Sequence, residues 1–69
     1  MKIKLHYRQS LTQMVRESLT NLVVKDLAVG GVHAHQISAS TIKFDSDEDY
    51  TLALLLLSGA EDYRIGVIE

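Results

Sequence analysis

Two histidines separated by a single residue, His33 and His35, are the side chains best suited to chemistry. On an extended strand, side chains two positions apart point to the same side about 7 Å apart, so both imidazoles can reach one ion. Neutral imidazole is a good ligand for zinc, nickel and copper. A third ligand would have to come from His6, Asp26 or the acidic run over 45–49. The pair therefore predicts either a divalent-metal site or, more simply, two half-exposed histidines on a short strand.

Several other chemistries lack the residues that they need. The chain has no cysteine, which excludes a disulfide scaffold, a thiolate zinc site and a catalytic thiol. Gly30 and Gly31 are not followed by a lysine and a serine or threonine at P-loop spacing, and no GxGxxG or GxSxG motif is present. A chain of 69 residues also has little room for a pocket and its supporting shell. We expect a non-enzymatic protein with no catalytic residues and no bound cofactor.

The first element that positions side chains is an N-terminal strand. Apolar and basic residues alternate over 1–8, which predicts a strand with one buried face and one solvated face. The basic side chains are Lys2, Lys4, His6 and Arg8. This stripe makes a nucleic-acid accessory protein one alternative function. A plain solvated face is the simpler interpretation, because the net charge is −2 and no RNP-type aromatic motif is present, so nucleic acid is not an expected partner.

A helix over about 11–28 is predicted next. Ser10 and Gln13 match a capping box, and Gly30 and Gly31 supply the helix exit. Apolar residues recur at three- and four-residue steps, which is typical of an amphipathic helix. The expected core stripe is Leu11, Met14, Val15, Leu19, Leu22, Val23 and Leu27.

Residues 32–45 have an extended composition, but their alternation changes phase. Ile37 and Ala39 lie in one register, whereas Ile42 and Phe44 lie in the other. Because a one-residue slip exchanges the two faces of a strand, one uninterrupted strand cannot bury all four side chains. Either a bulge near Ser38–Thr41 or a turn that separates strands over 32–37 and 41–45 resolves the conflict. We favour the turn.

A second helix is predicted over 47–58. Asp45 or Ser46 can cap it, and Asp47, Glu48 and Asp49 fill its first turn, where negative charge is favoured. The apolar run over 52–57 covers every azimuth of the helix, although a two-layer domain buries only one side of a helix. We expect part of the run, at Leu54 or Leu57, to be exposed or covered by another chain.

The expected order of elements defines the fold class. After the second helix, alternation over 62–69 predicts a last strand. The chain then forms one α+β domain over 1–69, a two-layer βαββαβ ferredoxin-like sandwich with two helices on one face of a small sheet. The alternative is βαβαβ with a bulged middle strand. That version would leave one face of a parallel sheet exposed, which parallel sheets rarely tolerate.

The stretch IKFDSDEDYTLALLLLSG, residues 42–59, resembles a pattern in small proteins of tailed phages. In that pattern a strand ends in an aromatic residue and is followed by an acidic helix start and a leucine-rich helix. The resemblance covers about a quarter of the chain and carries over no residue role. It implies a single-domain, non-enzymatic protein, and some such proteins inhibit host enzymes or defence complexes by binding them.

These observations predict a small protein-interaction module. The contact surface is expected on the helix over 47–58, through Asp47, Glu48, Asp49, Leu54 and Leu57, with a protein partner or a second copy as a homodimer. The metal site at His33 and His35 and the nucleic-acid accessory role remain alternatives. The longest apolar run has six residues, from Leu52 to Leu57, against the roughly 20 that a membrane span needs. No signal peptide is expected at the start, so we expect a cytoplasmic protein without a membrane partner.

Overall fold

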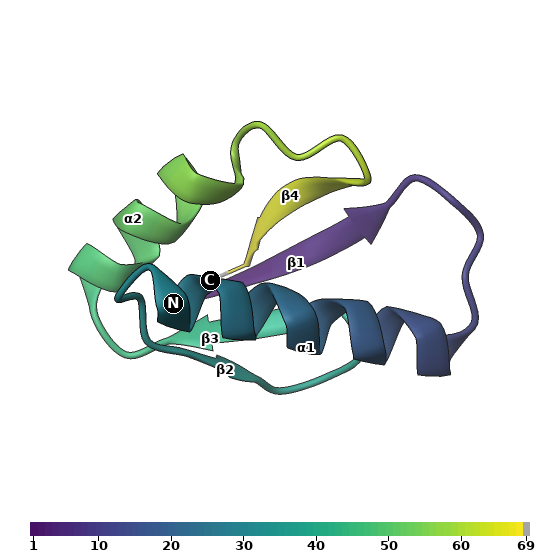
Figure 1. The fold of residues 1–69 in the computed structure, drawn as a ribbon, viewed down its shortest axis with the longest axis horizontal. Coiled ribbons are helices and arrows are strands. Elements are labelled where there is room, and N and C mark those ends of the chain that lie inside the picture. The colour runs from purple at the N-terminus through teal and green to yellow at the C-terminus, as the bar shows by residue number, and fades with distance from the viewer. Residues whose placement is uncertain (69) are drawn as a thin grey trace.

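A computed structural model of the protein describes residues 1–68, in which two helices cover a four-stranded sheet (Figure 1). The elements follow one another as β1 (Lys2–Tyr7), α1 (Gln13–Val29), β2 (Ala34–Gln36), β3 (Thr41–Phe44), α2 (Asp47–Leu57) and β4 (Tyr63–Ile68). The α+β class with two helices and an antiparallel sheet is therefore confirmed. No helix within residues 1–68 combines the length and the apolar character that crossing a membrane requires.

The sheet has the strand order β2-β3-β1-β4, and every neighbouring pair is antiparallel. β1 lies inside the sheet, pairing with β3 from Lys2 to Lys4 and with β4 along its whole length. β2 and β3 form the predicted hairpin, and the Ile37 N–H donates to the Thr41 carbonyl oxygen across the turn (3.0 Å). The alternative with one bulged middle strand is wrong, because the chain reverses between residues 37 and 40 and pairs with itself.

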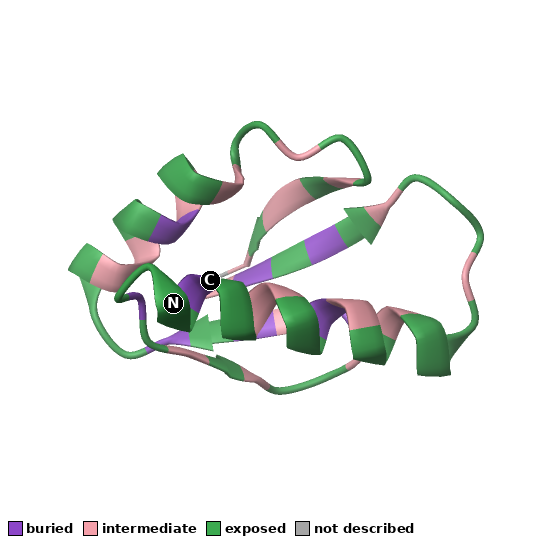
Figure 2. Cartoon of the chain, in the orientation of Figure 1, coloured by how far each residue is buried: buried purple, intermediate pink, exposed green. Residues whose placement is uncertain are grey.

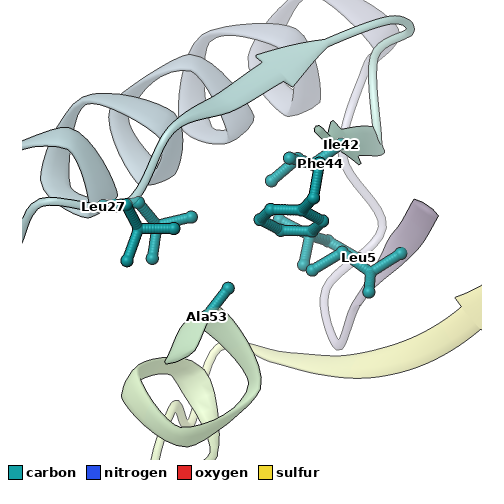
Figure 3. Close-up of a cluster of buried hydrophobic side chains, with 7 residues drawn as sticks. Leu5, Leu27, Ile42, Phe44 and Ala53 are labelled. Atoms are coloured by element: carbon teal, nitrogen blue, oxygen red, sulfur yellow. The ribbon is translucent and has the colours of Figure 1, made fainter. Parts of the chain in front are cut away.

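The core lies between the sheet and the helices. Alternation along β1 and β3 turns Ile3, Leu5, Ile42 and Phe44 inward, and all four are buried (Figure 2). Both helices contribute to this same cluster, which places them on one face of the sheet (Figure 3). The helix residues that complete the cluster are Leu27 from α1 and Ala53 from α2. The structure is thus a two-layer arrangement whose second sheet face is open.

The start of α1 differs from the prediction. Thr12, not Ser10, is the N-cap, since its backbone is extended and its Oγ1 accepts from the Val15 N–H (3.3 Å). The predicted Ser10–Gln13 capping box is therefore wrong, and Leu11 lies outside the helix. Both Ser10 and Thr12 have side chains that can cap a helix, and the structure uses Thr12.

The buried face of α1 is also rotated from the predicted stripe. Thr20 and Leu27 are buried, and Leu19, Val23 and Val24 are half-buried. Met14, Val15 and Leu22 were expected in the core, but they are 78%, 43% and 55% exposed. The helix carries apolar residues on more sides than the sheet covers, and the side that contains Thr20 is the one that packs. Thr20 can occupy this position because its hydroxyl is hydrogen-bonded to both the Tyr7 hydroxyl and the Ala39 carbonyl.

The end of α1 is a Schellman motif. The Gly31 N–H donates to the Ala28 carbonyl (3.0 Å), and the Val32 N–H donates to the Leu27 carbonyl (2.9 Å). Gly31 has φ of 85°, the left-handed conformation that this motif requires. Val32 and Leu27 are both buried, which supplies the hydrophobic contact that accompanies the motif. The predicted helix exit at the glycine pair is confirmed, and it delivers the chain to β2.

The start of α2 follows the prediction closely. Ser46 is the N-cap and its Oγ accepts from the Asp49 N–H (3.2 Å). Asp47, Glu48 and Asp49 occupy the first turn, where the unpaired N–H groups favour negative charge. At the other end, Ser58 donates from Oγ to the Leu55 carbonyl (2.9 Å), and the helix ends at Leu57. The local capping signals therefore define this helix.

Candidate functional surfaces

The histidine pair predicted from sequence lies at the start of the β2–β3 hairpin. His33 immediately precedes β2, His35 lies in its middle, and both side chains are exposed. The Nε2–H of His35 donates to Oδ2 of Asp45, at the end of β3, over 2.8 Å. This hydrogen bond, with the nearby charges of His35, Lys43 and His33, holds the pKa of Asp45 below its ordinary value of 3.8.

The same geometry bears on the predicted metal site. Asp45 is the member of the expected ligand set that lies beside His35, whereas His6 lies against β4 and Asp26 belongs to α1. Within residues 1–68, no three His, Asp or Glu side chains are grouped so that they could hold a metal ion. His35 thus has a carboxylate partner of its own, and a metal at this hairpin stays a prediction from sequence.

The open face of the sheet collects cations from three strands. The pairing register places Lys43 beside Lys2, Lys4 beside Gly66, and His6 beside Arg64. Since side chains opposite one another in an antiparallel pair share a face, these residues lie on the same side as the exposed Lys4. His35 belongs to this side too, because it pairs with Lys43. We call Lys2, Lys4, Lys43 and Arg64, with His6 and His35, the open basic face.

One close approach shapes the middle of this face. A Cβ atom placed on Gly66 would lie 2.6 Å from Nε2 and 3.0 Å from Cδ2 of His6. The His6 side chain is exposed, and its imidazole lies close to the backbone of β4 at Gly66. Gly66 is the residue that leaves this space, and a glycine inside a strand commonly marks such an approach.

Charge is segregated between the two layers. Four of the seven lysine and arginine residues lie on the open basic face. Asp45, at the end of β3, is an acidic side chain that bonds to a member of this face, His35. The other acids within residues 1–68 lie on the helices and in the β4 approach: Glu17, Asp26, Asp47, Glu48, Asp49, Glu61 and Asp62. The net charge of −2 therefore conceals a basic sheet face and an acidic helix layer.

The leucines of α2 are exposed at other positions than predicted. Leu54 and Leu57 are half-buried and pack against the core, so they are less exposed than expected, and cover of them by another chain stays a prediction. Ala53 is the buried residue of α2 and points into the core (Figure 3), and Leu54 and Leu57 pack against the same cluster. The exposed leucines are Leu52 (47%), Leu55 (68%) and Leu56 (58%).

Acidic and apolar groups adjoin on α2. A shallow hollow is lined by Asp47, Glu48, Thr51 and Leu52, which joins the acidic first turn to the exposed leucines. At the other end of the helix, Leu56 reaches Gly30, since its Cδ1 would lie 3.5 Å from a Cβ placed there. The α2 surface, defined as Asp47, Glu48, Leu52, Leu55 and Leu56, is thus continuous along the helix.

The sequence missed Lys43 and Arg64 as members of the basic face. Each lies in a short segment in which apolar and polar residues alternate, so the sequence indicates a strand. Only the strand pairing shows that the two residues adjoin β1. Arg8, which was included in the predicted stripe, follows β1, and it lines one hollow together with Arg64, Leu54 and Leu57. No known protein family, curated protein or solved structure matches this chain.

Proposed function

We propose that this protein is a non-enzymatic interaction module that binds another protein through the α2 surface. The observation that carries the proposal is the exposure of Leu52, Leu55 and Leu56 on one short helix. Contiguous apolar groups on small proteins usually mark interaction sites, because leaving them in water costs about 25 cal/mol per Å2.

The surface defines the chemistry of its partner. The leucines call for an apolar groove, as in the binding of an amphipathic helix to a hydrophobic cleft. Asp47 and Glu48 lie at one end of the surface, so the groove should be flanked by lysine or arginine at that end. Leu54 and Leu57 support the surface from below by packing on the core.

The proposal includes the finer assignments made from sequence. The element order and the strand order β2-β3-β1-β4 support a ferredoxin-like topology for the two layers. The resemblance of residues 42–59 to small proteins of tailed phages supports a host protein in the cytoplasm as the partner and inhibition as the outcome. Such a protein needs a rigid helix surface and no catalytic group.

The test compares two leucine-to-glutamate variants in capture and cross-linking experiments with host lysate. Leu55→Glu places a charge in the middle of the α2 surface, and Leu22→Glu places one on an exposed leucine of α1 as the matched control. We expect Leu55→Glu to weaken capture of the cross-linked partner at least about tenfold, because burial of a leucine contributes about 1.5–3 kcal/mol. Leu22→Glu should capture it as the wild type does.

Two results would contradict the proposal. One is equal capture by wild type and Leu55→Glu, with circular dichroism showing both folded. The other is a wild-type dimer in sedimentation analysis that Leu55→Glu converts to a monomer, because the surface would then belong to self-association.

A further inference from the structure

We propose that the open basic face is a second binding site, which takes single-stranded nucleic acid. Lys2, Lys4, Lys43 and Arg64 would contact phosphates, and the imidazole of His6 would contact a base. This site lies on the side of the sheet away from α2, and it is independent of the protein-binding function proposed above.

The lysines of the open basic face form an unfavourable charge arrangement that an anion would relieve. Lys2 and Lys43 are directly opposite each other on β1 and β3, and like charges in that position destabilise a sheet. Lys4 is the next outward residue on β1, and no ion pair joins any of these lysines to a carboxylate of residues 1–68. A polyanion along β1 would meet several cations at once, with release of its counterions.

The net charge of −2 does not prevent an anion from binding at the sheet face. The acids of α1, α2 and the loops lie in or beside the helix layer, and the molecule measures 21 Å along its shortest axis. At 0.1 M salt the Debye length is about 10 Å, so charges on the far side of the domain are largely screened at the sheet face. A ligand near the sheet therefore meets a positive surface, although the chain as a whole is acidic.

The position of the cations on a sheet face favours single strands over duplexes. Duplex DNA is read by a helix or a two-stranded ribbon that enters the major groove, whereas here the cations lie on the face of a four-stranded sheet. Sheet faces bind unpaired nucleotides, whose bases can spread over them and contact planar side chains, histidine included. Tyr7, Phe44 and Tyr63 point into the core, so His6 is the planar ring offered by β1.

These arguments predict a binding mode dominated by phosphate contacts. With a single ring available, base selectivity should be weak and dependence on salt should be strong. Four phosphate contacts on a single strand predict a slope of about −3 in a plot of log K against log salt concentration.

The test is fluorescence anisotropy of the full chain with labelled oligothymidylate and oligouridylate of about 20 nucleotides, over a series of salt concentrations. Lys4→Gln should weaken binding and make the slope shallower by about 0.7, the contribution of one phosphate on a single strand. Lys25→Gln is the matched control, since Lys25 is an exposed lysine on α1, in the opposite layer. It should leave both affinity and slope unchanged.

A third variant distinguishes the contribution of the His6 ring to binding from the contribution of the lysine charges. His6→Ala should weaken binding about fivefold or more while leaving the slope unchanged at pH 7.5, because it removes a base contact and no phosphate contact. Leu55→Glu should bind the oligonucleotide as the wild type does, so failure of the α2 proposal and failure of this one are distinguishable.

Four outcomes would overturn the proposal. These are no anisotropy change at the lowest salt concentration, an equal effect of Lys25→Gln and Lys4→Gln, tighter binding to a duplex of the same length, and binding to phosphatidylserine vesicles without binding to either oligonucleotide. The last outcome would assign the basic face to a membrane surface.

Discussion

The hydroxyl of Tyr7 donates a hydrogen bond to Oγ1 of Thr20, 2.7 Å away, and thereby links β1 to α1. The direction follows from the next bond, because the Thr20 hydroxyl uses its single proton on the carbonyl of Ala39 (2.7 Å). Thr20 is fully buried, so three elements meet at one polar atom inside the core: β1, α1 and the β2–β3 turn. This relay fixes the azimuth of α1 over the sheet.

Removal of the Thr20 hydroxyl is therefore expected to cost more than removal of the Tyr7 hydroxyl. Thr20→Val keeps the shape of the side chain but removes the partner of two groups on half-buried residues, the Tyr7 hydroxyl and the Ala39 carbonyl, which should lower the free energy of unfolding by about 1–3 kcal/mol. Tyr7→Phe leaves the bond to Ala39 intact and should cost about 1 kcal/mol. Urea denaturation measures both, and a larger loss for Tyr7→Phe would contradict the relay.

The rotated face of α1 gives a second prediction. Leu27 is 2% exposed and Leu22 is 55% exposed, although both were expected in one core stripe. Leu27→Ala should lower the free energy of unfolding by about 2–5 kcal/mol, the usual range for a buried leucine. Leu22→Ala should cost less than about 1 kcal/mol. If thermal or urea unfolding showed comparable losses of stability for the two variants, the core stripe predicted from sequence would be supported instead.

The two adjacent glycines at the end of α1 should respond differently to alanine. Gly31 has a positive φ of 85°, a conformation that costs an L-residue roughly 1–2 kcal/mol. Gly30 has φ of −81°, and an added Cβ would meet Leu27 O and Leu56 Cδ1 at 3.5 Å, an ordinary contact. We expect Gly31→Ala to lower the melting temperature and Gly30→Ala to leave it nearly unchanged. The reverse ranking would exclude the Schellman motif.

The pair His35–Asp45 predicts how stability depends on acid. The pKa of Asp45 is lowered in the folded state, chiefly by the hydrogen bond from His35. A lowered carboxyl pKa contributes stability above the unfolded value, and this contribution is lost as pH falls through the folded value. Wild type should therefore lose stability relative to Asp45→Asn as pH falls below about 4. Parallel curves for the two proteins between pH 6 and pH 2 would contradict this linkage.

The contact between His6 and Gly66 can be tested by adding a methyl group at Gly66, where the His6 ring now lies. Gly66→Ala puts a Cβ where the ring now lies, so the imidazole must swing away from β4. Because the ring is at the end of a side chain and alanine suits a strand better than glycine, stability should change by less than about 1 kcal/mol. Imidazole resonances in a proton–nitrogen correlation spectrum should shift for His6 and stay in place for His33. Unmoved His6 resonances would exclude the contact.

Sequence reasoning succeeded where the signal is local. The caps of α2 at Ser46 and Asp47–Asp49, the glycine exit of α1 and the alternation of β1 each lie within a few residues, and all are found in the structure. The phase change between Ile37 and Ile42 was enough to predict the hairpin, because a strand cannot change faces without a break.

The predictions that were wrong share one physical origin: they depend on contacts between residues that are distant in sequence. Thr20 is compatible with a core position only because Tyr7 and Ala39 satisfy its hydroxyl, and neither contact is visible in the periodicity of α1. The basic face likewise depends on a register that brings Lys43 and Arg64 beside β1. Apolar residues on several sides of α1 and α2 made the phase of both helices ambiguous.

The inner position of β1 has a consequence for biosynthesis. Its two neighbours, β3 and β4, both come later in the chain, and Lys2 pairs with Lys43 on one side and Ile68 on the other. A nascent chain that emerges from the ribosome therefore carries β1 with two unpaired edges until β3 has emerged, and with one unpaired edge until β4 follows. Such long-range pairing slows folding, and an unpaired strand edge invites aggregation or attack by proteases. Release of β4 is the step that completes the sheet and ends that exposure.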